Sequence, residues 1–158
     1  MKKIIIALII IFIGIQFIPV DRTNPPVKEE INAPENVLSI IQNSCYDCHS
    51  NKTEWPWYSY VAPVSFFITS DVSQGRRHLN FTEWNKYDNK RKEKKLDGIA
   101  EMVQEGDMPL ASYTLMHPSS KLNPEKITVI KDWVKSAGSN KNSSGNGNQK
   151  DESNGHKY

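Results

Sequence analysis

The chain has 158 residues, 37% of them hydrophobic, and a formal net charge of +2. Because positive and negative charges nearly balance, the net charge alone indicates no class of binding partner. Nothing in the composition suggests nucleic-acid binding. The two cysteines are too few for a disulfide framework, and the length allows one small domain with flanking segments.

The first predicted element is an apolar N-terminal segment. Lys2 and Lys3 precede an almost unbroken apolar run over residues 4–18, a pattern typical of an export signal. A helix over that run covers about 22 Å against a hydrocarbon core of about 30 Å, and extension over residues 1–20 closes much of the gap. Because no small-residue cleavage site follows, we predict a single uncleaved signal anchor in the inner, cytoplasmic membrane. The rest of the chain is then periplasmic. Cleavage is the competing outcome.

Composition divides the remaining chain into three segments. Residues 21–32 are polar, contain Pro25 and Pro26, and predict a short, partly extended tether. Residues 33–136 predict one folded domain. Residues 137–158 are rich in Ser, Asn, Gly and Lys, which predicts a disordered polar tail.

The folded domain opens with a predicted helix. Asn32 and Pro34 provide a cap and a first-turn proline. Val37, Ile40 and Ile41 then repeat at helical spacing, so one face of this helix is expected to pack against another helix.

A cysteine motif follows directly. Cys45, Cys48 and His49 form a C-x-x-C-H string, the attachment signature of c-type haem. Two thiols at this spacing can each add to one vinyl group of the same porphyrin, and the adjacent histidine then lies where a neutral imidazole binds iron. A thioredoxin-type pair requires a βαβ context and a closed zinc site requires four ligands, and neither pattern is present. We therefore predict one covalent haem c per chain, with His49 as proximal ligand.

Residues 55–67 are unusually rich in aromatic side chains and contain Pro56 and Pro63. This composition favours a loop that wraps an apolar disc, with an ordinary aromatic core as the alternative. The carbonyl group of either proline is a candidate acceptor for the Nδ1–H group of His49.

Two further helices are predicted downstream. One covers residues 63–74 and stops at Gly75, after which Arg76 or Arg77 is a candidate to pair with a haem propionate or is a solvated charge. The other begins with a basic run at residues 90–95, which is a solvated face or a docking patch for an acidic redox partner.

The terminal helix is predicted to begin at Asn123 and to stop at Gly138. The helix before it carries an apolar stripe that includes Leu96 and Val103 and ends at Gly106. No alternating strand pattern occurs, so the predicted fold class is all-α.

The iron position opposite the histidine has several candidate ligands. Met108 is the first choice, because it lies in a non-helical segment and the proline that follows restricts its backbone to extended conformations. Its thioether would raise the potential relative to a second imidazole. His78 would give a bis-histidine haem of lower potential, and Met116 or His117 could substitute from the same loop. Met102 follows the helical pattern and is predicted to be core.

Together these features resemble a small class I-type cytochrome c: the C-x-x-C-H motif, a preceding helix, a downstream Met-Pro pair and a terminal helix bearing Trp133. The chain is also similar to a narrower group of bacterial proteins that carry a haem-binding domain. The similar stretches are residues 43–50, 77–84, 106–113 and 117–118, within residues 33–136. The resemblance implies a cytochrome c-like helical domain wrapped around a covalent haem and an electron-transfer role, and it identifies no small-molecule substrate.

The leading functional prediction is therefore a membrane-tethered mono-haem cytochrome. It would carry electrons between redox protein partners at the membrane and would not itself be an enzyme. The alternatives are a haem-based sensor or gas-binding module with an open or weakly held distal position, and the haem subunit of a peroxidase-like complex.

Overall fold

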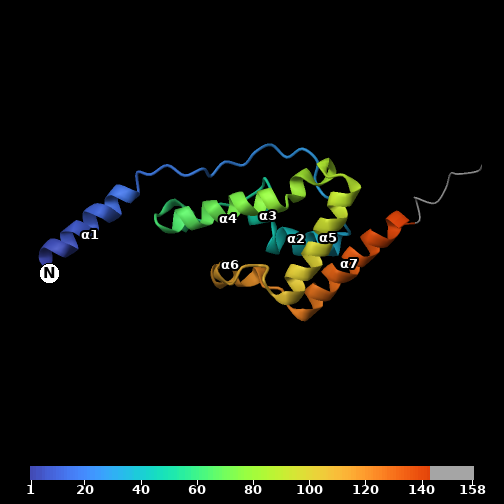
Figure 1. Cartoon of the computed structure of the whole chain (residues 1–158). Helices are drawn as coiled ribbons and strands as arrows, with labels where there is room; N and C mark the ends of the chain where they lie inside the picture. Colours follow the sequence, from blue (N-terminus) through green and yellow to red (C-terminus); the bar gives the residue numbers. More distant parts are fainter. Residues whose placement is uncertain (143–158) are drawn as a thin grey trace, which may run out of the picture.

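The computed structural model describes residues 1–142, with side chains described up to residue 138. Within this range the chain forms helices and connecting segments and no strand, which confirms the predicted all-α class (Figure 1). The α-helices are α1 (Lys2–Ile15), α2 (Glu35–Ser44), α3 (Tyr46–His49), α4 (Val64–His78), α5 (Asn89–Glu105), α6 (Ala111–Met116) and α7 (Pro124–Asn142). The 3-10 turns are η1 (Trp57–Tyr60), η2 (Phe81–Lys86) and η3 (Pro118–Ser120).

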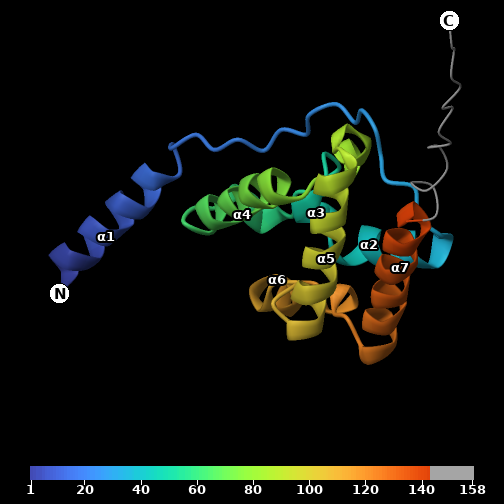
Figure 2. The ribbon, with the colours of Figure 1, turned by 45° about the vertical axis from the view of Figure 1, so that its right-hand side comes forward.

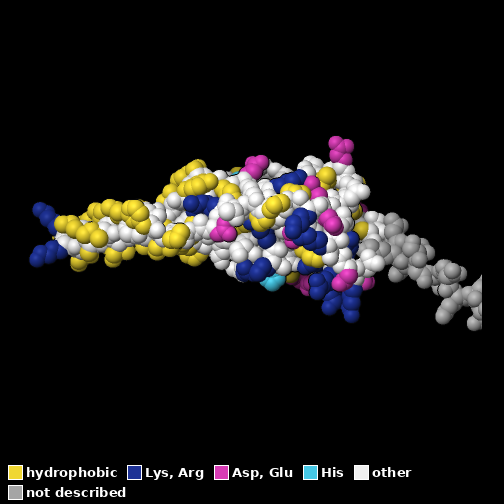
Figure 3. All heavy atoms as spheres, turned by 90° about the horizontal axis from the view of Figure 1, so that it is seen from above, with side chains coloured by type: hydrophobic (Ala, Val, Ile, Leu, Met, Phe, Trp, Pro, Cys, Tyr) yellow, Lys and Arg dark blue, Asp and Glu magenta, His cyan; other side chains and the backbone are white. Residues whose placement is uncertain are grey.

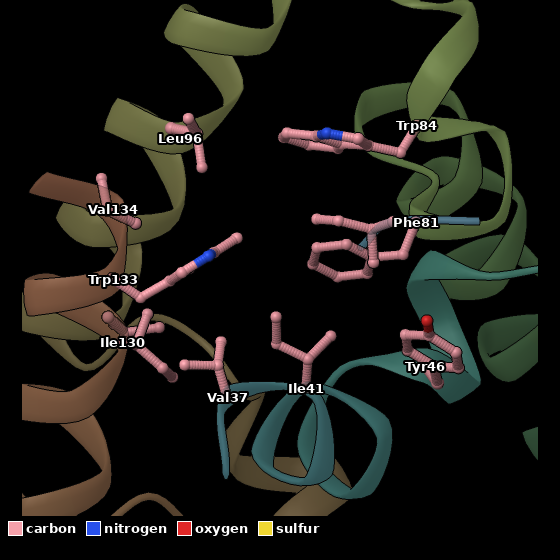
Figure 4. Packing of buried hydrophobic residues seen from close by; sticks show 11 residues of the cluster. Val37, Ile41, Tyr46, Phe81, Trp84, Leu96, Ile130, Trp133 and Val134 are labelled. Carbon is pink, nitrogen blue, oxygen red and sulfur yellow. The ribbon is translucent and has the colours of Figure 1, made fainter. Parts of the chain in front are cut away.

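The hydrophobic core lies where α2, α5 and α7 meet. The predicted apolar stripes are the buried faces: Val37 and Ile41 on α2, Leu96 and Val103 on α5, and Ile130, Trp133 and Val134 on α7. The side chains of this set that Figure 4 labels, which are all except Val103, point toward one another. In both ribbon views α5 lies between α4 and α7 (Figures 1 and 2).

A ladder of aromatic rings connects this core to α3. Tyr46 stacks on Phe81 with ring centroids 5.7 Å apart, and Phe81 stacks on Trp84 at 6.3 Å. All three rings are buried. Because Tyr46 lies inside the cysteine motif, this ladder fixes the motif against the core.

Helix α4 is longer than predicted. It continues through Gly75 and ends at His78. Gly75 is therefore not a helix stop, and its role is the close packing against α3 that is described below.

The N-terminal helix contradicts the location that was predicted for the protein. Helix α1 has 14 residues and ends at Ile15, where the side chain of Gln16 exchanges hydrogen bonds with the backbone of Ala62. Its apolar side chains are exposed (Figure 3). No helix within the described residues is long and apolar enough to cross a membrane. The predicted single N-terminal anchor, and the membrane location based on it, are wrong.

The segment expected to be a tether is packed on the domain. Ile31 is buried, and its backbone N–H donates to the carbonyl oxygen of Phe81 at 2.8 Å. The guanidinium group of Arg76 donates to the carbonyl oxygen of Thr23 at 2.8 Å and to Oδ1 of Asn24 at 2.7 Å. These bonds hold the segment along η2 and the end of α4.

The terminal helix begins as predicted, because the side chain of Asn123 accepts a hydrogen bond from the backbone N–H of Lys126 at 2.9 Å. It does not stop at Gly138 but continues to Asn142. The remainder of the predicted tail, residues 143–158, lies outside the described residues.

Candidate functional site

A cavity of about 880 Å³ lies beside α3 and is bounded by α4, α5 and the segment between α5 and α6. It brings together Cys45, Cys48, His49 and Met108, which are all partly buried. Much of the remaining wall is apolar and is formed by Ile41, Leu79, Phe81, Ile99, Val103, Leu110, Leu122 and Ile130. Met108 is distant along the chain from the cysteine motif, and the structure places both at one largely apolar cavity, as the sequence predicts.

The imidazole of His49 is oriented by the backbone of α4. Its Nδ1 atom lies 3.0 Å from the carbonyl oxygen of Gly75 and 3.1 Å from that of Leu79. Since a carbonyl oxygen can only accept, Nδ1 carries the proton, and Nε2 is the nitrogen that remains to bind a metal. The expected proline acceptor, Pro56 or Pro63, is replaced by these two carbonyls.

The electrostatics of His49 favour the neutral ring. Burial lowers the pKa of His49 below its ordinary value, and the two backbone hydrogen bonds oppose this shift in part. A neutral imidazole is the form that coordinates a metal ion. The position is therefore suited to a ligand role.

Gly75 permits helix α4 to lie directly on the cysteine motif. A Cβ atom at this position would lie 2.5 Å from the carbonyl oxygen of Cys48 and 3.1 Å from its Cβ atom. Cβ atoms in folded proteins essentially never make a contact as short as 2.5 Å, so only glycine allows this approach. The same approach places the Gly75 carbonyl within reach of His49.

The two cysteines are free thiols, and both are partly buried. Burial raises the pKa of Cys45 to about 12, with a smaller contribution from the neighbouring Cys48. Burial also raises the pKa of Cys48 to about 11. Thiol oxidoreductases need the opposite, a lowered thiol pKa that populates the thiolate. The environment therefore disfavours thiol redox chemistry.

The structure separates the candidate distal ligands. Met108 and His78 line the cavity, and so does Met102, which was predicted to be core. Met116 is 52% exposed on α6. His117 instead stacks on the ring of Tyr113, at a centroid distance of 4.4 Å. Neither Met116 nor His117 belongs to the described cavity wall.

Tyr113 is a site residue that no motif in the sequence indicates. It lines the cavity from α6, and its hydroxyl group donates to Oδ2 of Asp47 at 2.8 Å. Asp47 lies between the two cysteines of the motif, and Tyr113 follows Met108 by five positions. This bond therefore ties the segment carrying Met108 back to the motif. No local sequence pattern indicates it, because the partners are 66 residues apart.

We expect Tyr113→Phe to lower the free energy of unfolding by about 1.5–3 kcal/mol, because it removes a hydrogen bond to a charged acceptor. Burial and the bond to Asp47 also raise the pKa of Tyr113 above its ordinary value of 10.0. The phenol thus ionises more easily in the unfolded chain. Stability should fall above pH 10, and less steeply in the variant.

Denaturant unfolding of the wild type and the variant, at neutral and alkaline pH, measures both effects. The control is Tyr60→Phe, because Tyr60 is 58% exposed. An equal loss of stability in the two variants would contradict the role assigned to Tyr113.

The aromatic segment at residues 55–67 does not wrap the cavity. Its side chains are absent from the described cavity wall, and Trp57 is 75% exposed and Phe67 68% exposed. The aromatic side chains on the wall are instead Phe81, Tyr87 and Tyr113. The segment packs as η1 against α4, and Ala62 within it bonds to Gln16 near the end of α1. It was wrongly predicted as a cofactor loop.

The two neighbouring arginines also have different positions. Nε of Arg76 donates to the carbonyl oxygen of Ser50 at 2.8 Å, and its NH2 group donates to the Thr53 hydroxyl at 2.8 Å. Together with its bonds to the N-terminal segment, these contacts give Arg76 a structural role. Arg77 lines the cavity.

Comparison with known proteins gives one positive result. The family model described as "Haem-binding domain" matches residues 10–136. No curated protein and no solved structure matches the chain.

Proposed function

The chain belongs to the haem-binding domain family, and on this premise we propose that it is a mono-haem c-type cytochrome. It carries electrons between redox protein partners and is not itself an enzyme. The observation that supports this proposal most directly is the single cavity that gathers Cys45, Cys48, His49 and Met108.

The residues of the cavity fit a haem. A volume of about 880 Å³ lies in the upper part of the range of small-molecule sites. The apolar walls suit the faces of a porphyrin, the two thiols are free, and His49 is held as a neutral ring. Nothing in the wall requires a different type of cofactor.

Cys45 and Cys48 would provide the covalent attachment. Each thiol would add across one vinyl double bond, with the sulfur bound to one vinyl carbon and the proton transferred to the other. The step involves no net oxidation or reduction. Because the motif occurs once in the sequence, the proposed stoichiometry is one haem per chain.

His49 would bind the iron through Nε2, while Nδ1 stays bonded to the Gly75 and Leu79 carbonyls. Met108 would hold the same iron through its thioether. A thioether as the second ligand would favour the reduced form relative to a second imidazole. When bound, the haem supplies a one-electron couple, and the protein supplies its position and exclusion from water.

The covalent attachment gives a direct test. In a host able to mature c-type cytochromes, we expect haem to stay with the polypeptide through denaturing electrophoresis, with neither thiol titratable. Cys45→Ser and Cys48→Ser should each keep a single thioether and shift the pyridine haemochrome band toward that of a haem with one free vinyl group.

The control for these variants is Ser44→Ala, because Ser44 is buried beside Cys45 and its hydroxyl group has no partner within the described residues. It should keep both thioethers. A colourless wild-type protein with two titratable thiols would refute the proposal. Carbon monoxide binding by the reduced wild type, without denaturation, would favour the gas-binding alternative.

A further inference from the structure

The basic run of the sequence is divided between two faces of α5. Arg91, Lys94 and Lys95, at positions i, i+3 and i+4, line the cavity. Lys90 and Lys92 belong to the same run and are not part of the cavity wall. The run is therefore not uniformly a solvated face.

A fourth cation reaches the cavity from another helix. Arg77, in the last turn of α4, also lines the wall. The ammonium group of Lys95 joins the two helices, because it donates to the carbonyl oxygen of His78. It also lies over the Tyr87 ring, 4.7 Å from the centroid. Lys95 is thereby held at the edge of the cavity.

Acidic groups are concentrated elsewhere on the wall. Asp47 and Asp71 line the cavity, and after burial they are the groups that raise the pKa of Cys48. Lys95 and His78 instead lower the pKa of His49, after the larger effect of burial. The cysteine end of the cavity is thus acidic, and the end formed by α5 and the last turn of α4 is basic.

The acidic partners of the basic end are few. Within the described residues, Arg91 pairs with Asp88 at 3.6 Å, and both side chains are largely exposed. Such an exposed pair contributes little. Burial, with the adjacent Arg91, lowers the pKa of Lys95. This group of cations is therefore suited to an anion that enters the cavity.

We propose that Arg77, Arg91, Lys94 and Lys95 form a carboxylate-binding rim that takes the two propionate groups of the haem. The inference rests on the proposed function, since it requires a haem in this cavity. A carboxylate loses much of its hydration in an apolar cavity and needs a cationic partner to stay ionised. The basic end supplies such partners, whereas Asp47 and Asp71 would repel a propionate at the cysteine end.

The test is a titration of the propionates in the intact holoprotein. Cells supplied with 5-aminolaevulinate that carries carbon-13 in its carboxyl group label the haem at the propionate carboxyl carbons. The chemical shifts of these carbons in the reduced protein then follow their ionisation with pH. The variant R91Q/K94Q removes two rim charges, and K90Q/K92Q removes two charges from the same helix outside the cavity.

We expect the apparent propionate pKa to rise by about one unit in R91Q/K94Q, a tenfold change in the acid dissociation constant. It should rise by less than about 0.3 units in K90Q/K92Q, because Lys90 and Lys92 are not part of the cavity wall and lie farther from a bound propionate. Arg77→Gln should reproduce part of the rise from a different helix. Circular dichroism and the haem-to-protein ratio confirm that each protein is folded and loaded.

The outcomes separate this inference from the proposed function. If haem is attached but the propionates titrate alike in the two double variants, the rim assignment is wrong and the cytochrome proposal stands. If the propionates titrate alike and both double variants also slow electron exchange with an acidic redox partner equally, the basic run is a docking patch and not a rim. A wild-type protein without covalent haem removes the premise of both proposals.

Discussion

Replacement of Met108 by alanine is expected to open the coordination sphere of the iron. The ferric protein should lose its sulfur-to-iron charge-transfer band, and the reduced protein should bind carbon monoxide. The reduction potential should fall by more than about 100 mV, because axial ligation sets haem potentials over a range of about 0.8 V. Absorption spectra and a potentiometric titration measure these changes.

The chain offers two matched comparisons for this experiment. Met116→Ala removes an exposed methionine outside the described cavity wall and should leave the spectrum and the potential unchanged. His78 does line the cavity, so His78→Ala tests the bis-histidine alternative directly. If His78→Ala alters the coordination of the iron and Met108→Ala does not, the distal ligand has been misassigned.

We expect Gly75→Ala to damage the fold and the site together. The added methyl group would lie 2.5 Å from the Cys48 carbonyl oxygen, so α4 would have to move away from α3. Overpacking of this kind costs about 1–3 kcal/mol, and the shift would also weaken the hydrogen bond between the Gly75 carbonyl and His49. Denaturant unfolding and the yield of attached haem per chain measure the two effects.

Gly138→Ala is the control for the same chemical change. Gly138 lies inside α7, and nothing lies within 4 Å of the position of an added Cβ atom. This variant should gain about 0.5–1 kcal/mol from helix propensity. A similar response of the two variants would show that Gly75 is not required for packing.

The parts of the site that the sequence predicts are those with local signatures. The spacing of Cys45, Cys48 and His49 is a local property, and helical periodicity identified the faces that carry Val37 and Trp133. The non-helical position of Met108 before a proline favours it as a ligand, and the structure places it at the cavity. Its role as a ligand is still a prediction.

The parts that were missed depend on contacts between distant segments. A glycine rule predicted that α4 would stop at Gly75, but the requirement for glycine comes from Cys48, which is 27 positions earlier. The partner of Tyr113 is likewise 66 residues away. Local composition also misplaced the aromatic segment at residues 55–67, because aromatic side chains mark apolar surface without indicating which surface they meet.

The packed N-terminal segment has a practical consequence for any shortened version of this protein. A fragment that begins at Ala33 would lose residues 21–32. In the full chain the backbone N–H of Ile31 donates to the Phe81 carbonyl, and Arg76 donates to the Thr23 carbonyl. Phe81 is the ring that lies edge-on to His49, with centroids 6.4 Å apart. Removal of residues 21–32, which are not part of the described cavity wall, would therefore loosen the packing of Phe81 against His49. A recombinant fragment should begin before Asp21.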